Sequence, residues 1–490
     1  MADKGPIAET TSGQVRGVAD NGVETFHAIP YAAPPLGPLR FAAPQPAPRW
    51  AGVRDCITVG ASPPQGPSRL DAVMGIRKFA QSEDCLTLTV WTPKADSAKR
   101  PVMIWLHGGA YQSGGAHQPF YTGGNLAKAG DIVVVGVNYR LGALGYLYAP
   151  EAERSGGAAA NRGLLDQMAA LRWVRDNIAA FGGDPASITI CGQSAGGGSV
   201  LALLADPASR ALVKRAIPMS ASMFTLSQER AARINAAFYD AAGLPRGDID
   251  KLRALPVDAV VAAQRKVQLD IAATGDRTIA WQNVSPAPSC LQNPAKALMG
   301  GAASDVPLMI GTTLDEGHAW LAQDDALVAA TSFDVVAHTA EAGGYAAAAA
   351  DLPAARKAAA SKPWELLSAM MTWAVFEKPA RRLAEAHAAA GGDVWLYRFD
   401  WRPTRNAKYG ACHCIEIPFM FGNFADWSGA PMLSGHDASE VAELTHKTQG
   451  AWISFVRDGR PAVPGGPGWP KWSKDAQPTM VLDAGARVEA

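Results

Sequence analysis

The sequence predicts an α/β fold in which helices flank a mostly parallel central sheet. Short apolar runs rich in β-branched residues recur along the chain, and stretches with helical spacing separate them. Alternation of this kind is typical of a parallel sheet, because a helix usually makes each crossover between parallel strands. The expected strands are residues 101–106, 132–137, 187–191, 306–310 and 394–399.

Helices are expected between these strands and through the middle of the chain. Residues 164–178 have helical apolar spacing, and residues 200–205 are good helix formers that stop before a proline. The region from about 220 to 390 is mainly helical in pattern. Its alanine-rich part, residues 345–360, is expected to form plain helix because alanine has the highest helix propensity. No linker divides the chain, so we expect residues 1–490 to form one domain.

The composition excludes several classes of function. Lys and Arg together number 45, as do Asp and Glu, so the formal net charge is zero and nothing suggests a nucleic-acid partner. The N-terminal residues lack the apolar core of a signal peptide, and no apolar run reaches the ~18 residues of a membrane span. Six cysteines in 490 residues do not make a disulfide scaffold. We expect a cytoplasmic monomer or weak homo-oligomer with no membrane partner.

A serine between glycines follows the third expected strand. Residues 192–196 read Gly-Gln-Ser-Ala-Gly, and the helix-forming residues come next. Strand, G-x-S-x-G and helix together form the nucleophile elbow, whose tight turn exposes the serine hydroxyl at the carboxyl edge of a sheet. Ser194 is therefore the candidate nucleophile. The alternative is a glycine-rich loop that contains an unreactive serine.

A serine nucleophile needs a base, and the base needs a third group that orients it. In hydrolases with this elbow, the acid and then the histidine follow the serine in the chain. Asp315 and Glu316 both lie just after the expected strand at 306–310, and the pattern does not choose between them. His413 follows the strand at 394–399 in a loop and is the best-placed base.

A second glycine loop could bind the oxyanion of a tetrahedral intermediate. Residues 107–110, His-Gly-Gly-Ala, end the strand at 101–106 and form an HGGG-type loop, whose backbone N–H groups serve this purpose. A further N–H group comes from Ala195, the residue after the serine. A simple strand-ending turn would explain the glycines of this loop, but not its pairing with the elbow.

Ordered motifs along almost the whole chain resemble those of type-B carboxylesterases, the group that contains para-nitrobenzyl esterases and cholinesterases. These motifs are FHAIPYA at 26–32, SEDCL at 82–86, NYRLG at 138–142, FGGDP at 181–185, GQSAGG at 192–197, DEG at 315–317 and GACHCIEIPF at 410–419. The GQSAGG and CHCIEIPF segments are most similar to the bacterial phenmedipham (carbamate) hydrolase branch of that family.

The resemblance implies an α/β-hydrolase fold and a serine hydrolase that cleaves neutral aryl or alkyl esters, and aryl carbamates in the branch just named. It selects Glu316 over Asp315 as the acid and His413 as the base. The oxyanion donors that it implies are Gly109, Ala110 and Ala195. No cofactor or metal is implied, and the one-residue spacing of the two cysteines around His413 does not suit a zinc site.

Departures from the family pattern bear on the substrate. Gln193 stands where many members have Glu, and Gly75 stands where cholinesterases have a choline-stacking Trp. Both departures argue against choline esters. Arg40 and Glu83 match a structural ion pair of the family.

The chain also departs from the family's N-terminal disulfide, because residues 62–65 contain no cysteine to pair with Cys85. Cys56 lies nearby and could replace the missing partner, and two free thiols are the alternative.

The rival class of function is a catalytically inactive, cholinesterase-like binding module. Such modules usually lack a member of the catalytic triad and carry secretion and membrane segments. This chain keeps the serine, the acid, the histidine and the glycine loop, so we expect an enzyme.

Overall fold

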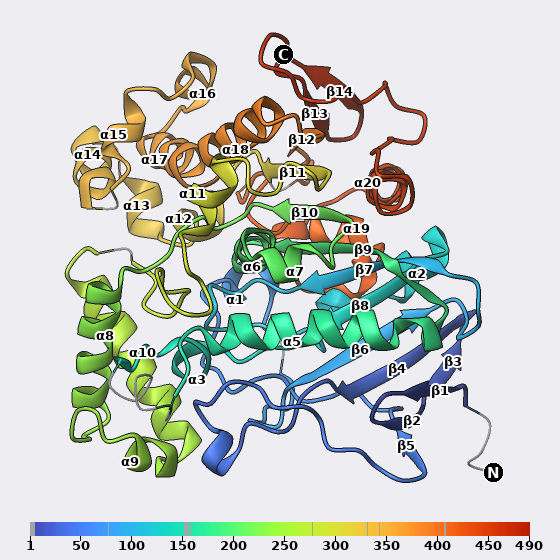
Figure 1. The fold of residues 1–490 in the computed structure, drawn as a ribbon. Helices are drawn as coiled ribbons and strands as arrows, with labels where there is room; N and C mark the ends of the chain where they lie inside the picture. The colour runs from blue at the N-terminus through green and yellow to red at the C-terminus, as the bar shows by residue number, and fades with distance from the viewer. Residues whose placement is uncertain are drawn as a thin grey trace.

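The computed structural model describes residues 5–76, 78–150, 156, 158–276, 278–330, 332–342, 344–405 and 408–490. Within these residues a large mixed sheet is flanked by helices (Figure 1). Its strands in chain order are β3 Val18–Asp20, β4 Val23–Pro30, β6 Thr87–Thr92, β7 Arg100–Leu106, β8 Val133–Val137, β9 Gly183–Gln193, β10 Arg215–Met219, β11 Leu308–Thr313, β12 Val394–Phe399, β13 Thr479–Leu482 and β14 Ala486–Glu489.

The spatial order of these 11 strands is β14-β13-β12-β11-β10-β9-β7-β8-β6-β4-β3. The block from β13 to β8 is parallel, and the pairs at both ends of the sheet are antiparallel. A separate sheet near the N-terminus contains β1 Ile7–Thr10, β2 Gly13–Arg16 and β5 Val53–Asp55. The parallel block brings the carboxyl ends of β7, β9, β10, β11 and β12 to one edge of the large sheet.

Helices cover both faces of the sheet, which explains why its inner strands are apolar throughout rather than alternating. One face carries α5 Arg162–Asn177, α6 Ala195–Ala205, α11 Pro294–Met299 and α18 Lys378–Ala389. The other carries α2 Gly124–Gly130, α19 Ile417–Phe421 and α20 Ala438–Asp458. All five residues of β8 are buried, as a strand covered on both faces requires.

The predicted strands and helices are present with shifted ends. The strand expected at 306–310 begins two residues later, at Leu308, because Pro307 has no N–H to donate to the ladder. The strand expected at 394–399 is β12, and the helix expected at 164–178 is α5.

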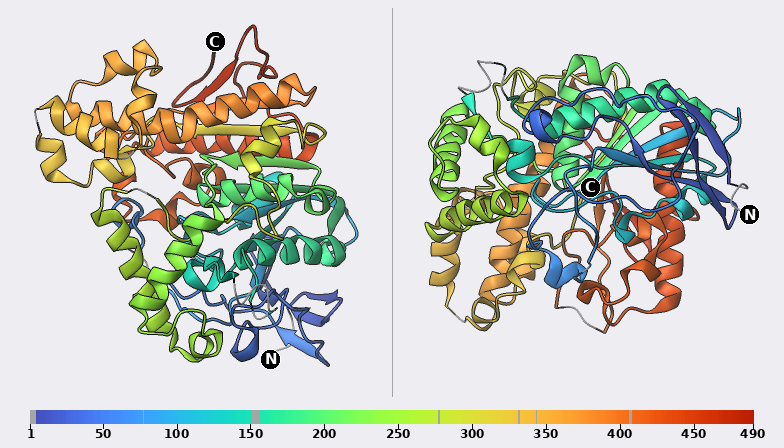
Figure 2. Two further views of the ribbon diagram at one scale, coloured as in Figure 1. Left: turned by 60° about the vertical axis from the view of Figure 1, so that its left-hand side comes forward. Right: turned by 90° about the horizontal axis from the view of Figure 1, so that it is seen from below.

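Two groups of helices extend the fold on one side of the molecule, opposite the N-terminal strands (Figure 2). The first group is α8 Gln228–Ala241, α9 Ile249–Ala254 and α10 Val257–Ala273. The second is α12 His318–Leu321, α13 Asp325–Ala329, α14 Phe333–Ala342, α15 Ala346–Ala349, α16 Ala354–Ala359 and α17 Pro363–Thr372, and a π-helical segment, Trp373–Glu377, joins α17 to α18.

The alanine-rich stretch is not the continuous helix that composition predicts. It forms two short helices, α15 and α16, which are interrupted around Pro353. Proline disfavours helical geometry at the residue before it and cannot donate a helical hydrogen bond. One proline therefore overrides the propensity of many alanines.

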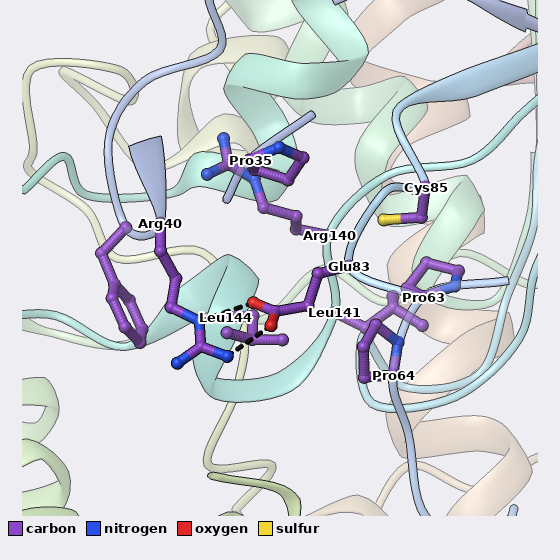
Figure 3. Close-up of a pocket in the computed structure, with 10 residues that line it drawn as sticks. Pro35, Arg40, Pro63, Pro64, Glu83, Cys85, Arg140, Leu141 and Leu144 are labelled. Atoms are coloured by element: carbon purple, nitrogen blue, oxygen red, sulfur yellow. Dashed lines mark hydrogen bonds and ion pairs between the residues drawn. The ribbon is translucent and has the colours of Figure 1, made fainter. Parts of the chain in front are cut away.

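The predicted ion pair between Arg40 and Glu83 is present. The Arg40 Nε donates to Glu83 Oε2 over 2.6 Å, and a second guanidinium nitrogen contacts the other carboxylate oxygen. Arg40 also donates to the backbone carbonyl oxygen of Arg253 over 2.9 Å, which ties the N-terminal region to α9. The pair lies in a pocket with room for about one water molecule. Because the guanidinium and the carboxylate bond to each other there, we interpret the pair as a structural contact and not as a substrate site (Figure 3).

The six cysteines are all buried free thiols, so Cys56 and Cys85 do not form a disulfide in this structure. Across the described ranges, none of the helices is both long and apolar enough to cross a membrane.

Candidate active site

The nucleophile elbow forms where the sequence predicts it. Strand β9 ends at Gln193 and α6 begins at Ala195, so Ser194 alone makes the turn, with φ +60° and ψ −120°. Such a conformation is strained for a residue with a side chain and is tolerated only where its surroundings enforce it. The Ser194 N–H donates to the carbonyl oxygen of Met219 over 2.9 Å, which anchors the turn to the end of β10.

The flanking glycines are required by close backbone approaches. A Cβ atom at Gly196 would lie 1.9 Å from the carbonyl oxygen of Leu106, and one at Gly192 would lie 2.5 Å from the carbonyl oxygen of Gly196. No side chain fits at either position. Ser194 is partly exposed, whereas the residues on either side of it in the chain, Gln193 and Ala195, are buried.

Glu316 contacts the histidine from the end of β11. Its Oε2 lies within hydrogen-bonding distance of His413 Nδ1. Its other oxygen, Oε1, accepts hydrogen bonds from the Ser220 hydroxyl over 2.6 Å and from the Thr313 N–H over 2.8 Å. The carboxyl group is completely buried, so these three contacts fix its orientation.

The neighbouring acid, Asp315, has a different position. Its Oδ2 accepts a hydrogen bond from the N–H of Ala411 over 3.0 Å, and its own N–H donates to the Ala411 carbonyl oxygen over 2.9 Å. Asp315 therefore holds the loop that leads to His413. Of the two acids that the pattern left open, Glu316 contacts the imidazole.

His413 is fully buried in the loop between β12 and α19. The ring centroids of Trp320 and Phe376 lie 4.9 Å and 5.0 Å from that of His413. The Gln193 amide nitrogen lies 3.1 Å from His413 Nε2. Among the described residues, no hydrogen bond joins Ser194 Oγ to His413, and catalytic hydrogen bonds of this kind often tighten only when substrate binds.

The glycine loop after β7 lies against the elbow. A Cβ atom at Gly108 would lie 3.1 Å from Ser194 Cβ and 2.9 Å from the Gln193 carbonyl oxygen. Gly109 and Ala110 follow with φ of +112° and +55°. Ala195 is the first residue of α6, and the first N–H groups of a helix have no intrahelical acceptor. The loop and the helix start thus approach Ser194 together.

His107 packs against the glycine loop and holds its backbone, a role that the motif alone did not reveal. Its Nδ1 lies 2.8 Å from the Gly108 carbonyl oxygen, and its ring stacks on Tyr139 with centroids 4.4 Å apart. The Tyr139 hydroxyl donates to the His107 carbonyl oxygen over 2.6 Å. Burial lowers the pKa of His107 to about 4, so its imidazole is neutral at physiological pH.

Ser220 is the other contact that sequence reasoning missed. It follows β10 at the carboxyl edge of the sheet, and its hydroxyl donates a hydrogen bond to Glu316, which follows the neighbouring strand β11. Its place after a parallel strand was the only available signal, because polar residues at such strand ends often belong to a site.

A second buried carboxyl group, Glu416, lies three residues after His413. Burial, assisted by the nearby charge of Glu316, raises its pKa to about 8. Neither of its carboxyl oxygens has a hydrogen-bond partner among the described residues. Glu416 is therefore mostly uncharged at neutral pH.

The two cysteines beside His413 point to different neighbours. The Sγ of Cys412 lies 3.9 Å from the Met432 sulfur, and the Sγ of Cys414 lies 3.3 Å from Gln193 Oε1. Burial raises the pKa of both thiols well above the usual range, so they remain protonated. In the described part of the chain, no group of three or more His, Cys, Asp and Glu side chains could hold a metal ion.

Comparison with known proteins places this geometry in a family. The model of the carboxylesterase family matches residues 4–490. Para-nitrobenzyl esterase of Bacillus subtilis is 38% identical over 99% of this chain and 96% of that enzyme. Phenmedipham hydrolase of Pseudarthrobacter oxydans is 36% identical over 99% of this chain and 96% of that enzyme.

A solved thermophilic para-nitrobenzyl esterase structure superimposes with a TM-score of 0.87 at 35% identity, covering 99% of this chain and 98% of the other. The predicted α/β-hydrolase fold and the family resemblance are thereby confirmed. The match extends over nearly the full length of these relatives, and we conclude that this chain belongs to the carboxylesterase family.

Proposed function

We propose that this carboxylesterase hydrolyses neutral carboxylic esters with Ser194 as nucleophile, His413 as base and Glu316 as the acid that orients the base. The contact between Glu316 Oε2 and His413 Nδ1 carries the proposal, because it joins two buried residues 97 positions apart beside a strained serine. A buried carboxylate that receives the Nδ1–H leaves Nε2 free to accept a proton.

Each proposed group has a defined step. His413 Nε2 accepts the Ser194 proton while Oγ attacks the ester carbonyl, and Glu316 stabilises the imidazolium that forms. The N–H groups of Gly109, Ala110 and Ala195 bind the oxyanion. His413 then gives the proton to the leaving alcohol, and water attacks the acyl-enzyme by the same route in reverse.

The preference for uncharged substrates rests on two positions. Gln193 places a neutral amide, rather than a carboxylate, beside the base. At Gly75 φ is +88°, and a Cβ atom would lie 3.1 Å from the Gly429 carbonyl oxygen, so an aromatic residue there would strain its own backbone and displace that of Gly429. A quaternary ammonium group would therefore lack a carboxylate at position 193 and an aromatic ring at position 75, two features that attract such a group.

Aromatic substrates are favoured by the rings around His413. Trp320 is partly exposed and lies parallel to Phe376, with an interplanar angle of 1° and centroids 6.2 Å apart. These rings give an aryl group an apolar surface beside the base. We therefore include nitrophenyl esters and aryl carbamates among the proposed substrates, which agrees with the names of the two similar enzymes.

The cellular setting is part of the proposal. Six buried free thiols fit the reducing cytoplasm, where disulfides are rare. We propose that the enzyme acts there as a monomer or weak homo-oligomer, with residues 1–490 as one domain.

Labelling and mutation test the nucleophile together. A serine-directed fluorophosphonate should add to Ser194, and Ser194→Ala should lower kcat for nitrophenyl acetate by about a million-fold. Ser222→Ala is the matched control, because Ser222 lies beside Ser194, its N–H donating to the Ser194 carbonyl oxygen over 3.1 Å, and it should stay active. An adduct on another residue, or a Ser194→Ala variant that keeps most of its activity, would refute Ser194 as the nucleophile. A protein that neither labels nor hydrolyses any ester would favour the inactive binding module.

A further inference from the structure

The Gln193 side chain touches three parts of the candidate site. It is 1% exposed, and its Oε1 lies 3.3 Å from Cys414 Sγ. Its Nε2 lies 3.1 Å and 3.4 Å from the two ring nitrogens of His413. A Cβ atom at Gly108, in the glycine loop, would lie 3.0 Å from the same Oε1. One amide thus lies between the base, a thiol and the proposed oxyanion loop.

The two similar distances to His413 define where the amide lies. A hydrogen bond in the ring plane to one imidazole nitrogen would leave the other nitrogen much farther away. Distances of 3.1 Å and 3.4 Å to both nitrogens place the amide over the face of the ring. Contacts between an N–H group and an aromatic face are weak but orienting. The Nε2 lone pair lies in the ring plane, so the amide leaves it free for Ser194.

The amide has one favoured orientation because of Cys414. A thiol donates a hydrogen bond, and a carbonyl oxygen can only accept one, so Oε1 faces the sulfur and the NH2 group faces the ring. Cys414 reaches this position with φ of +76°, a conformation that is uncommon for a residue with a side chain. The backbone strain at Cys414 accompanies the placement of its thiol against Gln193.

We propose that Cys414 and Gln193 are positioning residues, with the Cys414 thiol holding the Gln193 amide over the His413 ring so that the base stays aligned between Glu316 and Ser194. The rings of Trp320 and Phe376, which also contact the imidazole, limit its movement as well. The inference rests on the proposed function, since it assigns a purpose to a base that only that function requires.

Three cysteine variants test the thiol. Cys414→Ala removes the donor, Cys414→Ser replaces it with a hydroxyl, and Cys412→Ala is the matched control, a buried cysteine on the other side of His413 that faces Met432. Loss of one hydrogen bond predicts that Cys414→Ala lowers kcat for nitrophenyl acetate about five- to ten-fold with KM nearly unchanged. Cys414→Ser should return kcat to within about two-fold of the parent, and Cys412→Ala should stay within that range.

A double-mutant cycle tests whether the thiol acts through the amide. Gln193→Met keeps the length of the side chain and removes the amide, so it should lower kcat by at least as much as Cys414→Ala. The double variant should be no worse than Gln193→Met alone. Three results would overturn the proposal. The first is a double variant whose loss of kcat is the product of the two single losses, and the second is a Cys414→Ser variant whose kcat stays as low as that of Cys414→Ala. The third is an equal loss of kcat in Cys412→Ala and Cys414→Ala. If Cys414→Ala does not fold, the comparison of Gln193→Met with the parent decides, and an unchanged kcat refutes the positioning role.

Fluorophosphonate titration separates this proposal from the proposed function. Active-site counts near one per chain in every variant, with the adduct on Ser194, would mean that the hydrolase is intact and only the alignment of its base has changed. No adduct on Ser194 in the parent protein would refute the proposed function itself.

Discussion

Replacing Glu416 with glutamine should change how stability depends on pH. In the folded protein, burial and the nearby Glu316 charge raise the pKa of Glu416 from 4.5 to about 8. Between these values the folded state keeps a proton that the unfolded state has lost. The free energy of unfolding must therefore fall as pH rises, by about 1.4 kcal/mol per pH unit for this one group. The total over the interval is on the order of 4–5 kcal/mol.

Glutamine has the shape of the protonated acid and does not titrate. Replacing the carboxyl group with an amide breaks no hydrogen bond within the protein, because neither carboxyl oxygen of Glu416 has a partner among the described residues. We expect the melting temperature of Glu416→Gln to rise relative to that of the parent as pH increases from about 5 to 8, and the difference to level off above pH 8.

Differential scanning calorimetry of the full chain at half-unit pH steps measures this difference. Glu385→Gln on α18 is the control, because Glu385 is exposed, and its melting curve should follow that of the parent. Parallel pH profiles for Glu416→Gln and the parent would refute the reasoning. So would a parent protein that gains stability over the variant as the pH rises.

The remaining predictions concern catalysis and substrate. Glu316→Gln should lower kcat by about 10⁴-fold. Asp315→Asn should lower kcat far less, because Asp315 contacts the loop and not the imidazole. If steady-state kinetics show the larger loss of kcat in Asp315→Asn, Glu316 is not the acid. Ala110→Gly should keep its activity, since glycine suits φ of +55°. Ala110→Val should lose about 10²–10³ in kcat, because a β-branched residue strains that backbone and crowds the oxyanion loop. A neutral phenyl ester should have a higher kcat/KM than an acylcholine of the same acyl length, and the opposite preference would reveal a cation site elsewhere.

The elbow was predictable from local sequence because its constraints are local. A β-branched strand, a serine between glycines and a run of helix formers can satisfy the backbone in few ways, and β9, Ser194 and α6 adopt the expected one. The glycine loop after β7 was predictable for the same reason. The order of acid and histidine along the chain then limited the candidates to a few residues at strand ends.

Propensity failed where a single residue had a decisive geometric effect. Pro307 delays the start of β11, and Pro353 divides the alanine-rich stretch into α15 and α16. In both places the missing N–H outweighs the average preference of the surrounding residues.

Tertiary structure decided the contacts between distant segments. Asp315 and Glu316 are adjacent in the sequence, and only the packing of β11 against the loop after β12 shows that Glu316 contacts the histidine while Asp315 holds Ala411. Ser220 and Cys414 likewise gained their partners through folding, from residues 96 and 221 positions away. Sequence determined which chemical groups line the carboxyl edge of the sheet, because backbone geometry at each strand end is local. The pairing of those groups depended on strand order and side-chain packing, which no single segment specifies.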